Sequence, residues 1–203
     1  MSEAASAPPD DKKRRTHRRE QILQAAMDLF HQNGYHATGM DEIGAAAGIT
    51  GPGIYRHFKS KEQILATGIR EAVTEALERN QVIVASADSP RRALDGLIAN
   101  FVDGLLSNRW LSAVIMRERH ALSPATRRWV ERAEQAHVEQ WVRALSQVRP
   151  DLSDGEARLM VHGGLWMCLC VVYYECSIDP ARESEVLRQM VHAALLSSVI
   201  RPA

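Results

Sequence analysis

Apolar residues along this chain recur at three- and four-residue spacing, between short stretches rich in Gly, Pro, Ser and Asp. That spacing places them on one face of an α-helix, whereas a half-buried strand would alternate apolar and polar residues. Alternating runs joined by hairpin turns are nearly absent. The sequence therefore predicts an all-α fold of about nine helices. With 203 residues, 45% of them hydrophobic, the chain is long enough to bury a real core.

Capping signals divide the chain into those helices. Ser60 with Gln63, and Ser153 with Glu156, have the spacing of capping boxes, and Ser-Pro pairs at 89–90 and 123–124 open two further helices. Thr50 is the expected N-cap of a short third helix. The predicted helices span residues 14–33, 40–47, 51–58, 61–85, 90–107, 110–121, 124–149, 154–176 and 181–200.

Residues 40–58, MDEIGAAAGITGPGIYRHF, fit two short helices joined by a tight turn. Gly48 permits the left-handed turn conformation, and the apolar side chains of the segment can form a small core. In a helix-turn-helix the second helix enters the major groove of DNA while the first braces across the backbone. The residues expected to face outward carry no acidic group: Thr50, Gly51, Gly53, Tyr55, Arg56 and His57.

The longer segment RREQILQAAMDLFHQNGYHATGMDEIGAAAGITGPGIYRHFKSKEQIL resembles the N-terminal domain of the tetracycline-repressor (TetR) family. The resemblance implies a DNA-binding domain over residues 12–60 and a ligand-binding and dimerisation domain over 61–203. Residues 1–11 are small, polar and Pro-bearing, which predicts a disordered tail before these domains. It implies that Tyr55, His57 and Lys59 hold phosphates and that Thr38 contacts the DNA backbone. Thr50, Gly53 and Arg56 would face bases or adjacent phosphates. Gly51 is counted with this DNA-binding surface, although many relatives carry a lysine there.

Two points about this surface stay open at the level of sequence. Tyr55 could be mainly a packing residue. The basic arm DKKRRTHRRE, residues 11–20, carries a net charge of +4 in a chain with 25 basic and 25 acidic residues and no net charge overall. Its arginines, Arg15 among them, could attract DNA or could only solubilise the arm.

The C-terminal half carries no motif of comparable specificity. TetR-like regulators bind a ligand between its helices and dimerise through the last two, so the resemblance implies a homodimer, with the apolar stripes around Leu165 and Leu195 as its interface. The residues expected to line a ligand pocket are large and soft, with a few polar groups: Trp110, Met116, His120, Trp166, Met167 and Tyr173. Ordinary core packing is the alternative for each. A loose resemblance to regulators of lipid and acyl-CoA metabolism suggests a hydrophobic or acyl-type effector.

No secretory signal is visible, and the three cysteines are an odd number crowded into residues 168–176. That distribution is a poor disulfide framework and favours a reducing, cytoplasmic location without a membrane partner.

Two other classes of function fit the sequence less well. An enzyme would need a nucleophile with its base, a metal set or a phosphate cradle, and none is found; His162, Cys168 and Cys170 are six and eight residues apart and do not share a helix face. A helical adaptor would leave GITGPGIYRHFK unexplained. The predicted function is a ligand-responsive transcriptional repressor that binds operator DNA and needs no cofactor or metal, with activation as the alternative to repression.

Overall fold

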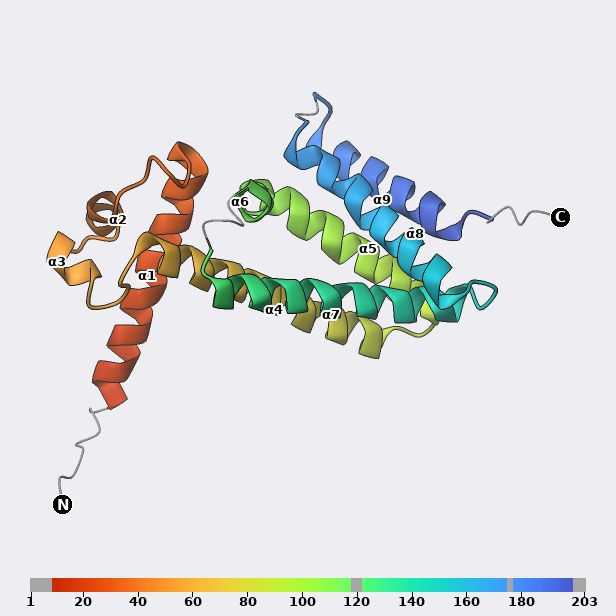
Figure 1. Ribbon diagram of the computed structural model, residues 1–203, viewed down its shortest axis with the longest axis horizontal. Helices are drawn as coiled ribbons and strands as arrows, with labels where there is room; N and C mark the ends of the chain where they lie inside the picture. Colours follow the sequence, from red (N-terminus) through yellow and green to blue (C-terminus); the bar gives the residue numbers. More distant parts are fainter. Residues whose placement is uncertain (1–8, 118–121, 175–176, 199–203) are drawn as a thin grey trace, which may run out of the picture. The chain divides into compact units, whose positions relative to one another are not determined.

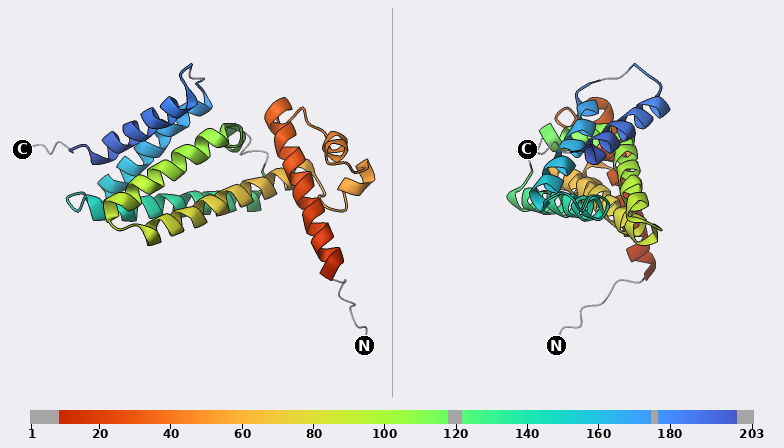
Figure 2. Two further views of the ribbon diagram at one scale, coloured as in Figure 1. Left: turned by 180° about the vertical axis from the view of Figure 1, so that it is seen from behind. Right: turned by 90° about the vertical axis from the view of Figure 1, so that its right-hand side faces the viewer.

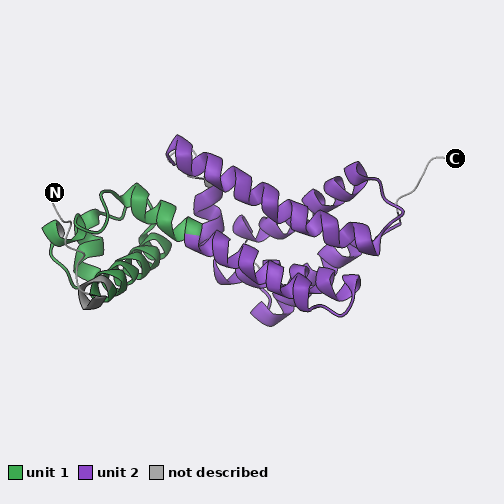
Figure 3. Cartoon of the chain, turned by 90° about the horizontal axis from the view of Figure 1, so that it is seen from below, with its two compact units in different colours: residues 1–70 green, residues 71–203 purple. Residues whose placement is uncertain are grey.

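The computed structural model describes residues 9–117, 122–174 and 177–198, and within these ranges it contains nine α-helices and no strand (Figure 1). The predicted all-α class is confirmed. The chain divides into two compact units, residues 1–70 and 71–203 (Figure 3). The sequence placed the domain boundary at residue 60, before the fourth helix, whereas the two units meet inside that helix, after Arg70.

Unit 1 consists of α1 (Pro9–Asn33), α2 (Met40–Ala46), α3 (Gly51–Ile54) and the first turns of α4 (Lys61–Ser86). Its largest fully buried side chains come from all four helices and from the turn after α3: Ile22, Phe30, Ile43, Ile54, Phe58, Ile64, Leu65 and Ile69. The start of α4 belongs to this unit because Gly68 lies directly against α1. A Cβ atom at that position would stand 2.7 Å from Sδ of Met27.

Two helix ends in unit 1 differ from the predictions. Helix α1 begins at Pro9 instead of Arg14, so residues 9–11, expected to be disordered, are helical. Proline is tolerated there because the first helical N–H has no partner within the helix. Helix α3 ends at Ile54 instead of Phe58, and hydrogen bonds of the tighter i to i−3 kind continue the chain, from Arg56 N to Gly53 O (3.2 Å) and from His57 N to Ile54 O (2.9 Å).

Unit 2 contains the rest of α4, then α5 (Pro90–Ser107), α6 (Arg109–Arg117), α7 (Pro124–Val148), α8 (Asp154–Cys168) and α9 (Pro180–Leu196). Helices α8 and α9 lie side by side (Figures 1 and 2). The core is formed where α5, α7, α8 and α9 meet, and it includes Leu94, Leu97, Trp141, Leu145, Val161, Leu187, Val191 and Leu195. Helix α8 was expected to reach Cys176, but it ends at Cys168 and a 3-10 turn, Leu169–Val172, follows.

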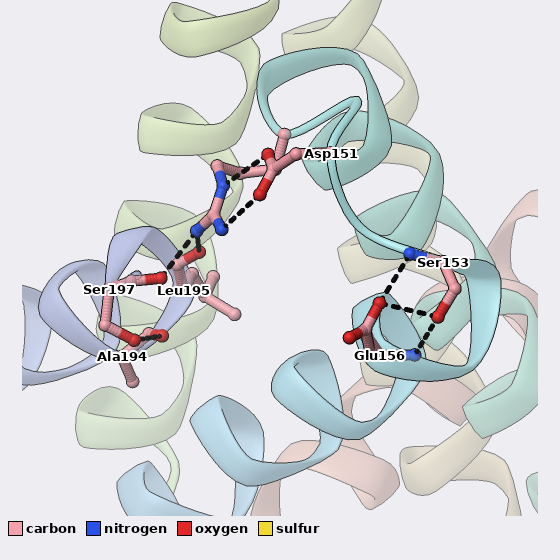
Figure 4. Close-up of polar contacts among 7 residues, drawn as sticks. Asp151, Ser153, Glu156, Ala194, Leu195 and Ser197 are labelled. Carbon is pink, nitrogen blue, oxygen red and sulfur yellow. Dashed lines mark hydrogen bonds and ion pairs between the residues drawn. The ribbon is translucent and has the colours of Figure 1, made fainter. Parts of the chain in front are cut away.

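Side chains close the helix ends where α7, α8 and α9 meet (Figure 4). Ser153 and Glu156 form the predicted capping box: Glu156 N donates to Ser153 Oγ (3.3 Å) and Ser153 N donates to Glu156 Oε2 (2.7 Å). Arg149 donates through Nη1 to the carbonyl of Ser197 (2.7 Å) and forms a bidentate pair with Asp151 at 2.8 and 2.7 Å. This arginine therefore satisfies a carbonyl that the end of α9 leaves without a helical partner.

Candidate nucleic-acid interface

The turn between α2 and α3 has the geometry that a helix-turn-helix requires. Gly48 adopts φ +67°, in the left-handed region that favours glycine, and Ile49 N donates to Gly44 O (2.9 Å) across the turn. Gly44 packs against the same turn, and a Cβ there would stand in ordinary van der Waals contact with Ile49 O, at 3.4 Å. Thr50 occupies the predicted N-cap position of α3, but its side chain makes no capping hydrogen bond.

Two cations that the sequence analysis did not single out hold this motif together from inside unit 1. The guanidinium of Arg19 donates to the carbonyl of His57 (2.8 Å) and lies 4.0 Å from the ring centroid of Phe58. Lys61 Nζ donates to the carbonyls of Tyr35 (2.7 Å) and Thr38 (2.9 Å). Both residues stabilise the turns on either side of α2 and α3, a role that charge alone gives no means to predict.

The outer face of the motif carries most of the predicted contact residues. Thr50, Tyr55, Arg56 and Lys59 are exposed, Tyr55 by 53%. Tyr55 is thus not a core residue, which removes the packing alternative. Gly53 and His57 are half-buried. Gly51 begins α3, and the backbone there is helical.

Thr38 is different. Its side chain is only 1% exposed, and its hydroxyl donates to Gly34 O at 2.9 Å. The prediction that this side chain contacts the DNA backbone does not fit that position, because the hydroxyl is turned into unit 1. A threonine before a helix has the same sequence signature whether it faces DNA or braces the preceding turn.

Unit 1 contains a basic cleft of about 770 Å³, which is lined by residues near the start of α1 and by residues just after α3. It is lined by Arg14, Arg15, His17, Arg18, Arg56 and His57. Arg15, Arg56 and His57 were separate candidates in the sequence; the structure brings them together because the N-terminal part of α1 and the turn after α3 line the same cleft. Arg14, His17 and Arg18 are additions that only the helical arm places there.

The electrostatics of the basic cleft act on His57. Burial, followed by the charges of Arg15, Arg18, Arg19 and Arg56, lowers the pKa of His57 below its usual 6.5. The imidazole is therefore neutral at pH 7 and can donate one hydrogen bond, while the surrounding guanidinium groups supply positive charge. Several guanidinium groups around one concave surface are suited to phosphate, which accepts bidentate hydrogen bonds from arginine.

Two of the predicted ligand residues lie on the surface of unit 2. Trp166 is 61% and Tyr173 is 64% exposed, so neither lies in an internal pocket of the protomer. Both were assigned to a pocket because a large apolar side chain has the same sequence signature inside and outside a bundle. Trp110, Met116 and Met167 are half-buried, and His120 lies outside the described residues.

The predicted dimer stripes also need correction. Leu165 is 8% and Leu195 is 0% exposed, because both side chains are part of the protomer's own core. Helices α8 and α9 instead expose Leu159 (74%), Trp166 and Met190 (42%). Within the described ranges no helix is both long and apolar enough to cross a bilayer.

Comparison with known proteins identifies the family. Residues 22–67 match the model of the bacterial regulatory proteins of the tetR family. The HTH-type transcriptional repressor KstR2 of Mycolicibacterium smegmatis is 30% identical over 151 residues, which cover 71% of this chain and 74% of the relative. The chain belongs to the TetR family. It is a transcriptional regulator with a helix-turn-helix DNA-binding domain, and the proteins of its family that it matches are regulators, not enzymes.

A second curated relative and a structural neighbour differ in what their names record. The HTH-type transcriptional activator FasR of Mycolicibacterium smegmatis is 36% identical over 86 residues, 37% of this chain and 39% of the relative. The structure of AibR in complex with isovaleryl coenzyme A and operator DNA shares the fold with a TM-score of 0.70 at 23% identity, covering 86% of this chain and 96% of AibR. The family match begins at Ile22, so the arginines on the first turns of α1 precede it.

Proposed function

We propose that this TetR-family regulator binds operator DNA as a homodimer through α3 and the basic cleft, and that a small molecule bound in unit 2 releases it. The cleft is the observation that carries the proposal. The cleft is lined by Arg15 of α1 together with Arg56 and His57. These last two residues follow α3, the helix of the motif that carries no acidic side chain.

In this arrangement Tyr55, His57 and Lys59 hold phosphates, and Arg15 adds a phosphate contact from α1. Arg56, Thr50 and Gly53 face base edges or the phosphates beside them. Phosphate contacts fix the position of a protein on the duplex, whereas contacts to base edges read the sequence. An arginine in the major groove pairs best with the two acceptors of guanine. Arg56 is therefore the residue from which we expect discrimination between operators.

Salt dependence tests the phosphate contacts. The logarithm of the binding constant falls with the logarithm of salt concentration by about 0.9 per neutralised phosphate. If each protomer loses one contact, Arg15→Ala makes the slope shallower by about 2 for a dimer on its operator, and Lys59→Ala acts alike. Both variants should weaken binding to all sequences equally. Arg56→Ala should also reduce discrimination between operator variants.

The measurement is fluorescence anisotropy with the DNA upstream of the protein's own coding region, over a series of salt concentrations. Arg128→Ala is the matched control, since Arg128 is an exposed arginine of α7 in unit 2. An unchanged slope for Arg15→Ala would contradict the role given to the cleft. A loss for Arg128→Ala as large as that for Arg15→Ala would show that overall charge, not the cleft, sets affinity.

An acyl-type effector is supported by AibR, whose structure holds isovaleryl coenzyme A together with operator DNA. Repression is supported by the KstR2 relative, and FasR is the reason to keep activation as the alternative. An effector that couples by about 1 to 3 kcal/mol changes operator affinity roughly 5- to 150-fold. Isovaleryl coenzyme A added to the anisotropy assay tests this choice, and an unchanged operator affinity would exclude it as an effector.

A further inference from the structure

A network of uncharged polar side chains connects α4, α5 and α7 in unit 2. Its centre is Asn80, which is 0% exposed. Asn80 Nδ2 donates to Gln140 Oε1 (2.9 Å) and lies 3.2 Å from His137 Nδ1, while Asn80 Oδ1 accepts from Asn100 Nδ2 (2.8 Å). Both hydrogens and one lone pair of this buried amide are therefore used.

The direction of every bond in the network follows from one backbone carbonyl. The carbonyl of Leu77 only accepts, so the group of Gln140 that lies 3.4 Å from it is the amide nitrogen. The oxygen of Gln140 then faces Asn80, which must present its own nitrogen. Because this same nitrogen faces His137 Nδ1, the Nδ1 atom accepts, and the proton of the neutral imidazole resides on Nε2.

That tautomer leaves two buried donors without an acceptor. His137 Nε2 and Trp141 Nε1 are buried, and neither has a hydrogen-bond partner in the described part of the chain. They lie one turn apart on α7, with ring centroids 5.9 Å from each other. The ring of Phe101 packs against both, at 5.5 and 5.8 Å. A buried donor left unsatisfied keeps the full cost of its removal from water, so two such donors on one helix face point to an acceptor that binds there.

We propose that His137 and Trp141 bind the carbonyl group of a neutral molecule, which enters unit 2 beside Phe101. A carbonyl oxygen accepts two hydrogen bonds and brings no proton of its own, so it satisfies both donors and adds no donor that would need an acceptor. A hydroxyl or a water would bring protons of its own, which would need further acceptors. A carboxylate would lack a counter-ion, since the network contains no charged side chain.

The state of the imidazole agrees with a neutral ligand. Burial lowers the pKa of His137 to about 4, so this residue does not provide a cation at neutral pH. The carbonyl-binding site itself does not depend on the proposed function. Only the identification of its ligand as the effector rests on that function. A thioester carbonyl of an acyl-type molecule belongs to the same chemical class as a ketone, and both present one uncharged acceptor oxygen.

The test compares 2-octanone with hexyl methyl sulfide, which replaces the carbonyl by a sulfur atom in a chain of the same length. Binding to the full-length protein is followed by the ¹⁵N–¹H resonances of the Trp141 indole and the His137 imidazole, assigned with the variants Trp141→Phe and His137→Asn. We expect the ketone to shift both resonances, to bind at least about tenfold more tightly than the sulfide, and to lose that preference in Trp141→Phe.

Three results would overturn the proposal. The ketone could leave both resonances unmoved, ketone and sulfide could bind equally, or the two protons could contact only a bound water that the ketone does not displace. Operator binding is measured without the ketone or the sulfide. Its absence would refute the DNA-binding proposal and would leave the carbonyl-binding proposal unaffected. Ketone binding with an unchanged operator affinity would uphold the site and exclude it as the effector site.

Discussion

The buried imidazole of His137 makes unit 2 sensitive to acid. Burial lowers the pKa of this residue from its ordinary 6.5 to about 4, so the unfolded chain binds a proton at a pH where the folded chain does not. Stability is therefore fully present above pH 6.5 and falls as the pH decreases from 6.5 towards 4. One pKa unit corresponds to about 1.4 kcal/mol, so the full shift is worth about 3 kcal/mol, of which about 2 kcal/mol is lost between pH 7 and pH 5.

Urea unfolding at pH 7 and pH 5, followed by tryptophan fluorescence, measures this loss. All four tryptophans lie between residues 110 and 166, so the signal reports unit 2. His137→Asn keeps an acceptor for Asn80 and removes the titrating group, and it should lose about 2 kcal/mol less than the wild type between the two pH values. His162→Asn is the control, since His162 is exposed on α8. Protomer concentration is held constant, because dimerisation affects apparent stability. Equal pH dependence in the wild type and His137→Asn would refute the reasoning.

Four further substitutions test other parts of the structure. Thr38→Val removes the hydroxyl that donates to Gly34 O and should lower the free energy of unfolding of unit 1 by about 1 kcal/mol, measured by circular dichroism; unchanged stability would contradict the internal role. Gly48→Ala forces a Cβ into φ +67° and should cost about 1 to 2 kcal/mol in the same assay, and a neutral result would mean that the turn relaxes. Trp166→Glu puts a charge on the exposed face of α8 and should give folded monomers in light scattering. Leu195→Glu puts a charge into the core and should unfold unit 2. A folded, monomeric Leu195→Glu variant would instead place Leu195 at the dimer interface.

The order of the helices and the helix-turn-helix were predictable because their signals are local. Ser89 accepts from Arg92 N, Ser123 accepts from Thr126 N, and Ser153 pairs with Glu156 as their spacing indicates. Gly48 adopts the positive φ expected of it. A cap or a tight turn depends on residues within four positions of one another, so the sequence contains all the partners that decide it.

Inward and outward orientation was less predictable. Periodicity shows that a helix has an apolar face but not what covers that face. For this reason Leu195, expected at the dimer interface, lies in the core, and Trp166, expected in a ligand pocket, lies on the surface. The same holds for charged residues. Nothing in the sequence distinguishes Arg19 and Lys61 from solvated cations, yet their partners are backbone carbonyls of residues 38 and 26 positions away.

The two sites show what tertiary structure alone decides. The basic cleft needs Arg15 of α1 beside Arg56 after α3, and the sequence could name both residues but not join them. The network around Asn80 was invisible in the sequence, since Asn80, Asn100 and His137 belong to three helices and none carries a motif. An isolated amide or imidazole on a helix has the same sequence signature in water or in a core. Only the packing of α4, α5 and α7 removes the water, fixes the tautomer of His137, and leaves two donors for a molecule from outside.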